Sequence, residues 1–108
     1  MSKERILYCV WTKIDQQYEK EWIEYIDKEH YPDVLKTKYF ISAKRFKVID
    51  GQAEGNYLSI YETTSKEKLQ QYVEKEAGRL RQDYLDHFGD KSKLHRVVLK
   101  EVFSLEEA

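Results

Sequence analysis

The segment that most constrains the fold of this chain runs from residue 18 to residue 35. Large apolar side chains recur there at i, i+4, i+7 and i+8, the spacing of a buried stripe on an α-helix. The stripe consists of Tyr18, Trp22, Tyr25 and Ile26. Pro32 disfavours helical geometry at the residue before it, so we expect this helix to end near His30.

Four other segments are rich in β-branched and aromatic residues and therefore predict strands. They cover residues 5–13, 39–49, 56–63 and 94–103. A second apolar stripe between residues 64 and 88 predicts a second helix, with Gly78 as a point where it can break in two. The order β-α-β-β-α-β predicts a single α+β domain over residues 1–108 with the ferredoxin-like fold, a four-stranded antiparallel sheet with two helices on one face.

Alternation along the strands divides their side chains between the two faces of this sheet. We expect the helices to cover a mainly aliphatic set: Leu7, Cys9, Leu58, Ile60, Val97 and Leu99. The open face would then carry Tyr8, Val10, Tyr57, Tyr61, Arg96 and Val98. Because that face is too apolar to stay in contact with water, we predict a homodimer joined by sheet faces into a closed α/β barrel.

Charge composition narrows the classes of partner. The chain is 36% charged, but 19 Lys and Arg balance 20 Asp and Glu, which argues against a nucleic-acid or membrane-surface partner. Residues 55–61 weakly resemble the third strand of RNA-recognition modules, which have the same element order, but such modules need a basic surface. Cys9 is the only cysteine and no signal-peptide pattern is visible, so we expect a cytoplasmic protein.

The sharpest candidate for chemistry is the pair Glu29 and His30 at the end of the first predicted helix. An unperturbed histidine titrates near pH 6.5 and can act as an acid or a base, with Glu29 as a partner if the helix has ended. Alternatively, the His30 ring caps the helix or bonds the backbone of the following loop. A functional His30 would lie near the open end of the barrel.

A second candidate is a set of tyrosine and arginine side chains that could orient an aromatic or anionic ligand in an apolar pocket. The set consists of Tyr8, Arg45, Tyr57, Tyr61 and Arg96. The same residue types also suit a filled dimer interface. We interpret Arg79 and Arg81 as surface charges of the second helix.

No pattern in the sequence predicts a cofactor or a metal. The three histidines, His30, His87 and His95, lack metal-ligand spacing, and the single cysteine has no partner for such a site. Neither a phosphate-binding glycine loop nor a nucleophile elbow is present.

Several short motifs, in order, resemble a known family. They are Thr12-Lys13-Ile14-Asp15, Trp22 with Glu29-His30-Tyr31-Pro32 and Leu35, Thr37, Tyr72, Arg79-Leu80-Arg81, His87-Phe88-Gly89 and Arg96-Val97-Val98-Leu99. Over nearly its whole length the chain resembles the bacterial DUF4286 family within the dimeric α/β-barrel superfamily. The resemblance implies the fold and the dimer but no reaction. It also implies Thr-Gly before the second strand, where this chain has Thr37-Lys38.

Two function hypotheses follow. The first is a non-catalytic or ligand-sensing homodimer with a small-molecule pocket at the barrel. The second is a cofactor-independent enzyme, similar to the monooxygenases or isomerases of the superfamily, that acts on a small aromatic or anionic substrate with His30 as acid or base. A hollow barrel interior would favour a ligand pocket, and a packed one a purely structural dimer.

Overall fold

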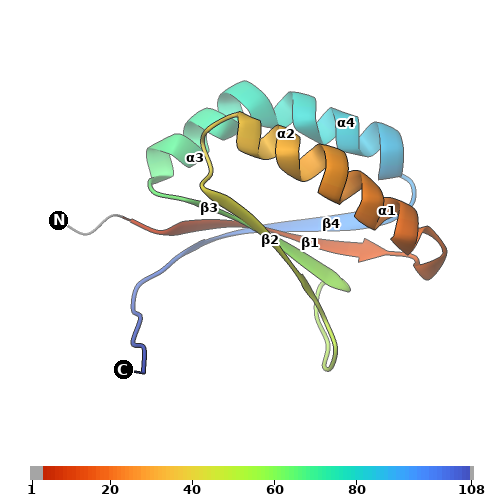
Figure 1. The fold of residues 1–108 in the computed structure, drawn as a ribbon, viewed down its shortest axis with the longest axis horizontal. Helices are drawn as coiled ribbons and strands as arrows, with labels where there is room; N and C mark the ends of the chain where they lie inside the picture. Colours follow the sequence, from red (N-terminus) through yellow and green to blue (C-terminus); the bar gives the residue numbers. More distant parts are fainter. Residues whose placement is uncertain (1–3, 108) are drawn as a thin grey trace.

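The computed structural model describes residues 4–107 and confirms the predicted order of elements (Figure 1). The strands are β1 (Ile6–Ile14), β2 (Ser42–Lys47), β3 (Tyr57–Thr63) and β4 (Ser92–Lys100). They form an antiparallel sheet in the order β2-β3-β1-β4, and the helices all lie on one of its faces. The predicted ferredoxin-like α+β arrangement is therefore present.

The first helical segment does not end at His30. After a short 3-10 turn (η1, Gln16–Tyr18), α1 (Glu19–Tyr25), a π-helical turn (η2, Ile26–His30) and α2 (Tyr31–Lys36) continue as one helix. The N–H of Tyr31 donates to the carbonyl of Ile26, five residues back. This wider turn makes room for the Pro32 ring in the first turn of α2, where proline's missing N–H costs little.

The second helical segment is also continuous, although Gly78 was a predicted break. It comprises α3 (Lys66–Tyr72), a second π-helical turn (η3, Val73–Ala77) and α4 (Gly78–Phe88). Gly78 keeps helical backbone angles, with φ −57° and ψ −48°. The irregularity that the sequence signalled is thus a π turn rather than an interruption.

The prediction of which face the helices cover was wrong. Strand register places Tyr8 opposite Tyr61 and Val10 opposite Arg96, and these residues face the helices. The predicted open-face set, Tyr8, Val10, Tyr57, Tyr61, Arg96 and Val98, shares that covered side. The set expected beneath the helices, Leu7, Cys9, Leu58, Ile60, Val97 and Leu99, instead lies on the open face.

The helices cover the aromatic set because the space beneath them is deep and contains polar groups that can bond tyrosine hydroxyls. Tyr8 and Tyr61 pack with Phe40 and Tyr72 in one buried cluster, and Trp22 packs with Tyr57 in the other. Bulky rings fill this layer, and the hydroxyls of Tyr8 and Tyr57 form hydrogen bonds with Arg81 and Glu19 on the helices.

The turn from α2 into β2 has the geometry that the family resemblance implied. Lys38 has φ +69°, in the left-handed region that favours glycine, and its N–H donates to the carbonyl of Leu35 at 3.1 Å. Lys38 is the only non-glycine residue of 4–107 with a positive φ. The helix therefore ends in a left-handed residue, the position that glycine usually occupies, but here this residue is a lysine.

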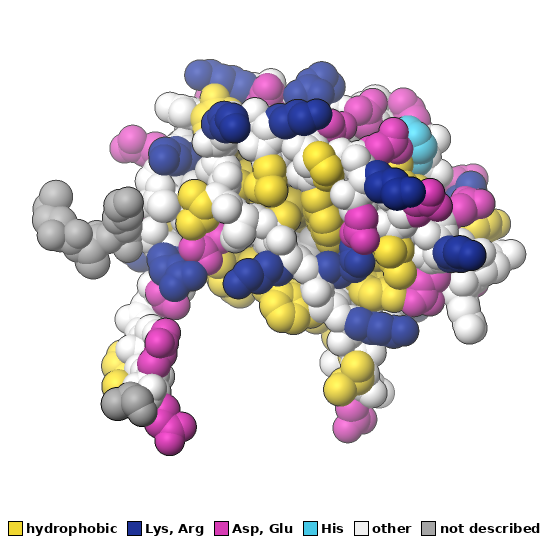
Figure 2. Space-filling view, viewed as in Figure 1, with side chains coloured by type: hydrophobic (Ala, Val, Ile, Leu, Met, Phe, Trp, Pro, Cys, Tyr) yellow, Lys and Arg dark blue, Asp and Glu magenta, His cyan; other side chains and the backbone are white. Residues whose placement is uncertain are grey.

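Two segments project from the sheet on the side away from the helices (Figure 1). One is the loop between β2 and β3, anchored because Asn56 exchanges two hydrogen bonds with the backbone of Ile14 at 2.9 and 3.1 Å. The other is the tail after β4. Both carry hydrophobic side chains (Figure 2) that are more than three-quarters exposed: Ile49, Val102, Phe103 and Leu105.

Candidate functional site

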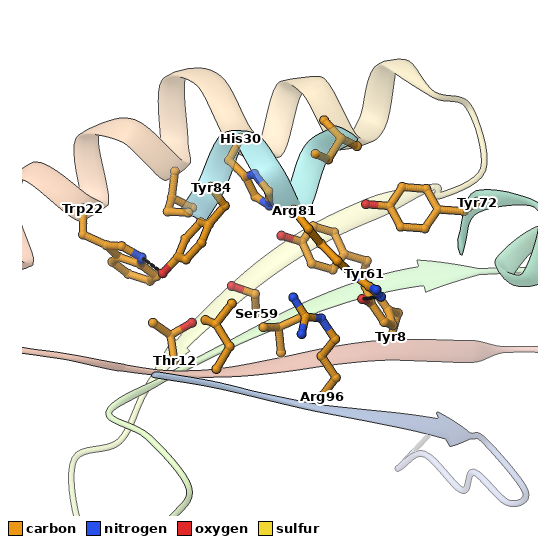
Figure 3. Close-up of a pocket in the computed structure, with 14 residues that line it drawn as sticks. Tyr8, Thr12, Trp22, His30, Ser59, Tyr61, Tyr72, Arg81, Tyr84 and Arg96 are labelled. Atoms are coloured by element: carbon orange, nitrogen blue, oxygen red, sulfur yellow. Dashed lines mark hydrogen bonds between the residues drawn. The ribbon is translucent and has the colours of Figure 1, made fainter. Parts of the chain in front are cut away.

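A small cavity lies between the helices and the covered face of the sheet (Figure 3). Its volume is about 40 Å³, room for about three water molecules. Helices supply Trp22, Ile26, His30, Tyr72, Leu80, Arg81 and Tyr84, and strands supply Tyr8, Val10, Thr12, Ser59, Tyr61, Leu94 and Arg96. The cavity is therefore part of one chain and does not depend on a space between two copies.

The two π turns sit beside this cavity. His30 is the last residue of η2, and Leu80 and Arg81 follow η3 within its next helical turn. A π turn inserts one residue into the helix and rotates the side chains that follow it, which is why such turns often occur at functional sites. The local backbone thus sets where His30 and Arg81 point.

His30 faces the cavity and makes no hydrogen bond to any residue in 4–107. Its ring packs edge-on against Tyr84, with 5.7 Å between ring centroids. Burial lowers the pKa of His30 from 6.5 to about 4, against the opposing effects of Asp33 and Asp83 and with a small contribution from Arg96. The imidazole is therefore neutral near pH 7 and free to bind the contents of the cavity.

The predicted capping role of His30 is not observed. The ring does not bond the backbone of residues 31–35 within the described chain, as a cap would. The ring lies beneath the helices, and the helix continues through Pro32 instead of ending there. A place for His30 near the open end of a two-chain barrel stays a prediction.

Glu29 does not join His30. Its side chain is exposed and borders an outer groove that also includes Tyr25 and His87. Consecutive residues on a helix point about 100° apart, so a Glu29–His30 couple would have required the helix to end.

The five predicted ligand residues separate into two groups. Tyr8, Tyr61 and Arg96 line the cavity. Arg45 instead forms an ion pair with Asp27 and lies over the Trp22 ring, 5.7 Å from its centroid.

Tyr57 belongs with Arg45 rather than with the cavity. Its hydroxyl donates to Glu19, and its pKa is raised to about 12 by burial and by that carboxylate. Arg45 and Tyr57 therefore stabilise the packing of α1 on the sheet.

Sequence reasoning misassigned one cavity residue, Arg81. Arg79 is a surface charge as predicted and pairs with Glu76 at 3.6 Å, but Arg81 lines the cavity and donates from Nη2 to the Tyr8 hydroxyl at 2.9 Å. The signal was its spacing, since Arg81 lies four residues after Ala77 and three before Tyr84, on the buried stripe.

Other lining residues were not predicted because their role depends on long-range contacts. Trp22 Nε1 donates to the Tyr84 hydroxyl at 3.0 Å, and that hydroxyl also shares a hydrogen bond of 2.8 Å with Ser92. Ser59 shares one of 2.7 Å with the Tyr31 hydroxyl. These bonds pair Trp22, Tyr84 and Ser59 with protein groups, so these side chains are less available to a ligand than His30 and Arg96, which make no side-chain hydrogen bond within residues 4–107.

Within residues 4–107, no three His, Cys, Asp or Glu side chains are grouped to hold a metal ion. No helix in this part of the chain is long and apolar enough to cross a membrane.

Comparison with known families identifies the chain. The model of the family described as a domain of unknown function, DUF4286, matches residues 5–102. The chain belongs to this family. No curated protein matches this DUF4286 sequence.

Solved structures share the fold at low sequence identity. An ethyl tert-butyl ether d (EthD) family protein from Bacillus halodurans has a TM-score of 0.69 and 16% identity, covering 92% of this chain and 99% of its own. A putative monooxygenase from Shewanella loihica has a TM-score of 0.64 and 12% identity, and the match covers 96% of this chain and 100% of the monooxygenase. A dimeric ferredoxin-like protein from an uncultured marine organism has a TM-score of 0.60 and 13% identity, and the match covers 96% of this chain and 100% of the marine protein. At such identities the DUF4286 chain shares their fold alone.

Proposed function

We propose that this DUF4286 protein is a non-catalytic, ligand-sensing homodimer that binds a small molecule in the helix–sheet cavity of each chain. The observation that carries the proposal is His30, a neutral imidazole that faces a cavity and has no hydrogen-bonding partner among residues 4–107. A ring nitrogen that faces a cavity and bonds no protein group is available to orient a ligand there.

The ligand itself must be small, or must open the cavity as it enters. The present volume of about 40 Å³ is well below that of typical pockets for drug-sized molecules. The α3–η3–α4 helix forms one wall, and its π turn gives that wall an irregular, adjustable turn.

The dimer is supported by the open face of the sheet. Leu58 of β3 lies between Trp11 of β1 and Phe46 of β2, and Ile60 lies beside Cys9 of β1, in a layer that no helix covers. The apolar residues of this face are Leu7, Cys9, Trp11, Phe46, Leu58, Ile60, Val97 and Leu99. A contiguous apolar sheet face of this kind is normally covered, and a second copy covers both faces at once.

The two projecting segments fit the same assembly. The β2–β3 loop and the C-terminal tail extend on the open side of the sheet, and their exposed apolar side chains would flank a second copy there (Figure 2). One solved structure with this fold is described as a dimeric ferredoxin-like protein.

Light scattering of the wild type and two charge variants tests the dimer. Phe46→Glu places a carboxylate on the open face, and Leu85→Glu places one on α4, at residues that are 51% and 50% exposed. We expect a dimer mass for the wild type and Leu85→Glu and a monomer mass for Phe46→Glu. A monomer mass for the wild type overturns the assembly.

A crystal structure of the protein as purified tests the ligand site. We expect density in the cavity within hydrogen-bonding distance of a His30 ring nitrogen, and loss of that density in His30→Gln. A cavity that contains only water, with the same occupancy in His30→Gln, would contradict a ligand at this site.

A second candidate is a cofactor-independent enzyme with His30 as its acid or base, supported by the neutral imidazole at the cavity. Two solved structures with this fold are named as putative monooxygenases. A base with a pKa of about 4 is weak, which favours the binding role. Turnover of a small aromatic or anionic substrate that falls below pH 4 and disappears in His30→Gln would establish the enzyme instead.

A further inference from the structure

The arginines of this chain differ in how their charge is compensated. Arg5, Arg45 and Arg79 each pair with a carboxylate, from Glu62, Asp27 and Glu76 respectively. The remaining two, Arg81 and Arg96, make no ion pair with any residue in 4–107. Both of these two line the cavity.

The Arg81 guanidinium has unused hydrogen-bonding capacity. Its Nη2 donates to the Tyr8 hydroxyl at 2.9 Å, but its Nε is fully buried and has no partner among the described residues. A buried N–H of a charged group that stays unbonded costs the full free energy of removing it from water. The chain therefore keeps a charged donor in place without supplying an acceptor.

Arg96 approaches the same space from the opposite wall. It extends from β4 toward the helices, whereas Arg81 descends from α4 toward the sheet (Figure 3). Arg96 is exposed enough to reach water, which places it at the mouth. The two guanidinium groups thus bring two positive charges to one small cavity.

The surrounding polar groups do not neutralise these charges. The cavity walls contribute hydroxyls, among them those of Tyr8, Tyr61 and Tyr72, and no carboxylate. The nearby Asp33 and Asp83 influence His30 but form no ion pair with either arginine. Two like charges in a partly desolvated site repel each other unless an anion lies between them.

We propose that Arg81 and Arg96 bind a small carboxylate in this cavity, either a free monocarboxylate or the acid group of a larger ligand. A carboxylate is planar and accepts two parallel hydrogen bonds from a guanidinium. Because the Arg81 Nε–H is fully buried, the cavity must widen beside it for a carboxylate to accept from that group while it pairs with Arg96. The volume of about 40 Å³ suits a group of three or four heavy atoms. This inference rests on the proposed ligand-binding function and names the chemical class of the ligand.

Titration with sodium acetate, compared with neutral acetamide, tests the inference on the full chain. The readouts are the NMR resonance of the Arg81 Nε–H and the melting temperature. We expect acetate to shift the Nε–H resonance saturably and to raise the melting temperature, and acetamide to do neither. Equal responses to acetate and acetamide would overturn the carboxylate assignment.

Three single variants locate the site. Arg81→Gln and Arg96→Gln should each weaken acetate binding by about tenfold or more, the expected loss for one charge-assisted contact. Arg79→Gln removes a charge from the same helix at an exposed, already paired position and should bind acetate as the wild type does. Should Arg81→Gln not fold, Arg96→Gln decides the outcome, because Arg96 is exposed on an edge strand.

The outcomes separate this inference from the function on which it rests. An equal loss of acetate affinity in Arg79→Gln and Arg96→Gln would mean a general effect of net charge and would overturn the proposed site. A neutral molecule found against His30, with acetate binding absent, would overturn the carboxylate and leave the ligand-binding function standing. An empty cavity together with no acetate binding would overturn both.

Discussion

The two faces of the sheet differ in chemistry although both alternate regularly along the same strands. The covered face carries aromatic rings, and hydroxyl groups on this face bond helix residues, as Tyr8 does with Arg81 and Ser59 with Tyr31. The open face carries aliphatic side chains, such as Leu58 and Ile60, that need no polar partner. The helix layer is thick and contains donors and acceptors, whereas a second sheet offers a flat apolar surface.

This comparison also explains where the candidate site lies. Large, rigid rings packed between a sheet and two irregular helices leave a small cavity between them. Polar side chains at its walls, such as His30 and Arg96, can bind a ligand there. On the open face, which no helix covers, aliphatic and aromatic side chains such as Leu58 and Trp11 lie side by side.

The largest effect is expected from removing one tryptophan on each face. Trp22 is fully buried beneath the helices, and Trp11 is half-buried on the open face. Trp22→Ala should lower the free energy of unfolding by about 3–5 kcal/mol at every protein concentration. Trp11→Ala should cost less, and its cost should grow with protein concentration, because it removes a contact between copies.

Urea unfolding of both variants at low and high protein concentration measures this difference. Equal losses that do not depend on concentration would mean that the open face is not an interface.

The next effect is the pH dependence caused by His30. Its pKa is 6.5 in the unfolded chain and about 4 when folded, so below pH 6.5 the unfolded state binds the additional proton. The contribution of His30 to the free energy of unfolding does not change above pH 6.5. As the pH drops from 6.5 to about 4, this contribution lowers the free energy of unfolding by roughly 3 kcal/mol.

Unfolding free energies of the wild type and His30→Gln between pH 8 and pH 4 test this. The variant should lack the loss, while carboxylates such as Glu4 and Glu19, whose pKa values are lowered by hydrogen bonds, titrate alike in both proteins. Parallel curves for the two proteins would mean that His30 is not buried in its neutral form.

A smaller effect is expected from the hydroxyl that joins the helices on the covered face. Tyr84→Phe leaves the Trp22 N–H without its acceptor and should cost about 1–3 kcal/mol. Tyr39→Phe is the control, since Tyr39 is half-buried and bonds no other side chain in residues 4–107. Thermal unfolding compares them, and an equal cost at both positions would remove the special role of the Tyr84 hydroxyl.

The smallest effect concerns the turn that links the covering helix to the edge strand. Lys38→Gly should stabilise the protein by about 0.5–1 kcal/mol, because glycine adopts a φ of +69° without steric cost. Lys36→Gly, two residues earlier in α2, should destabilise by about 1 kcal/mol. Chemical denaturation of both variants checks the opposite signs, and a loss for Lys38→Gly would contradict the strained turn.

Much of the fold could be predicted from local signals. The strand alternation and the stripe through Trp22 and Ile26 gave the order of elements, because period and propensity are properties of the chain itself. At the start of the first helical segment, the carboxylate of Asp15 accepts from the N–H of Gln17, a local cap of the kind that aspartate favours. The resemblance to DUF4286, carried by short motifs, is confirmed by the family match.

Only the tertiary structure decided which face the helices cover and where the site lies. Both side-chain sets of the sheet are apolar enough for either role, so their choice depends on partners far away in sequence, such as Arg81 for Tyr8. In the same way, the helix passes Pro32 through a π turn, because the packing of Tyr31 and Val34 against the core outweighs the local preference to stop. Local sequence thus determined the elements, and long-range packing and hydrogen bonding determined their faces.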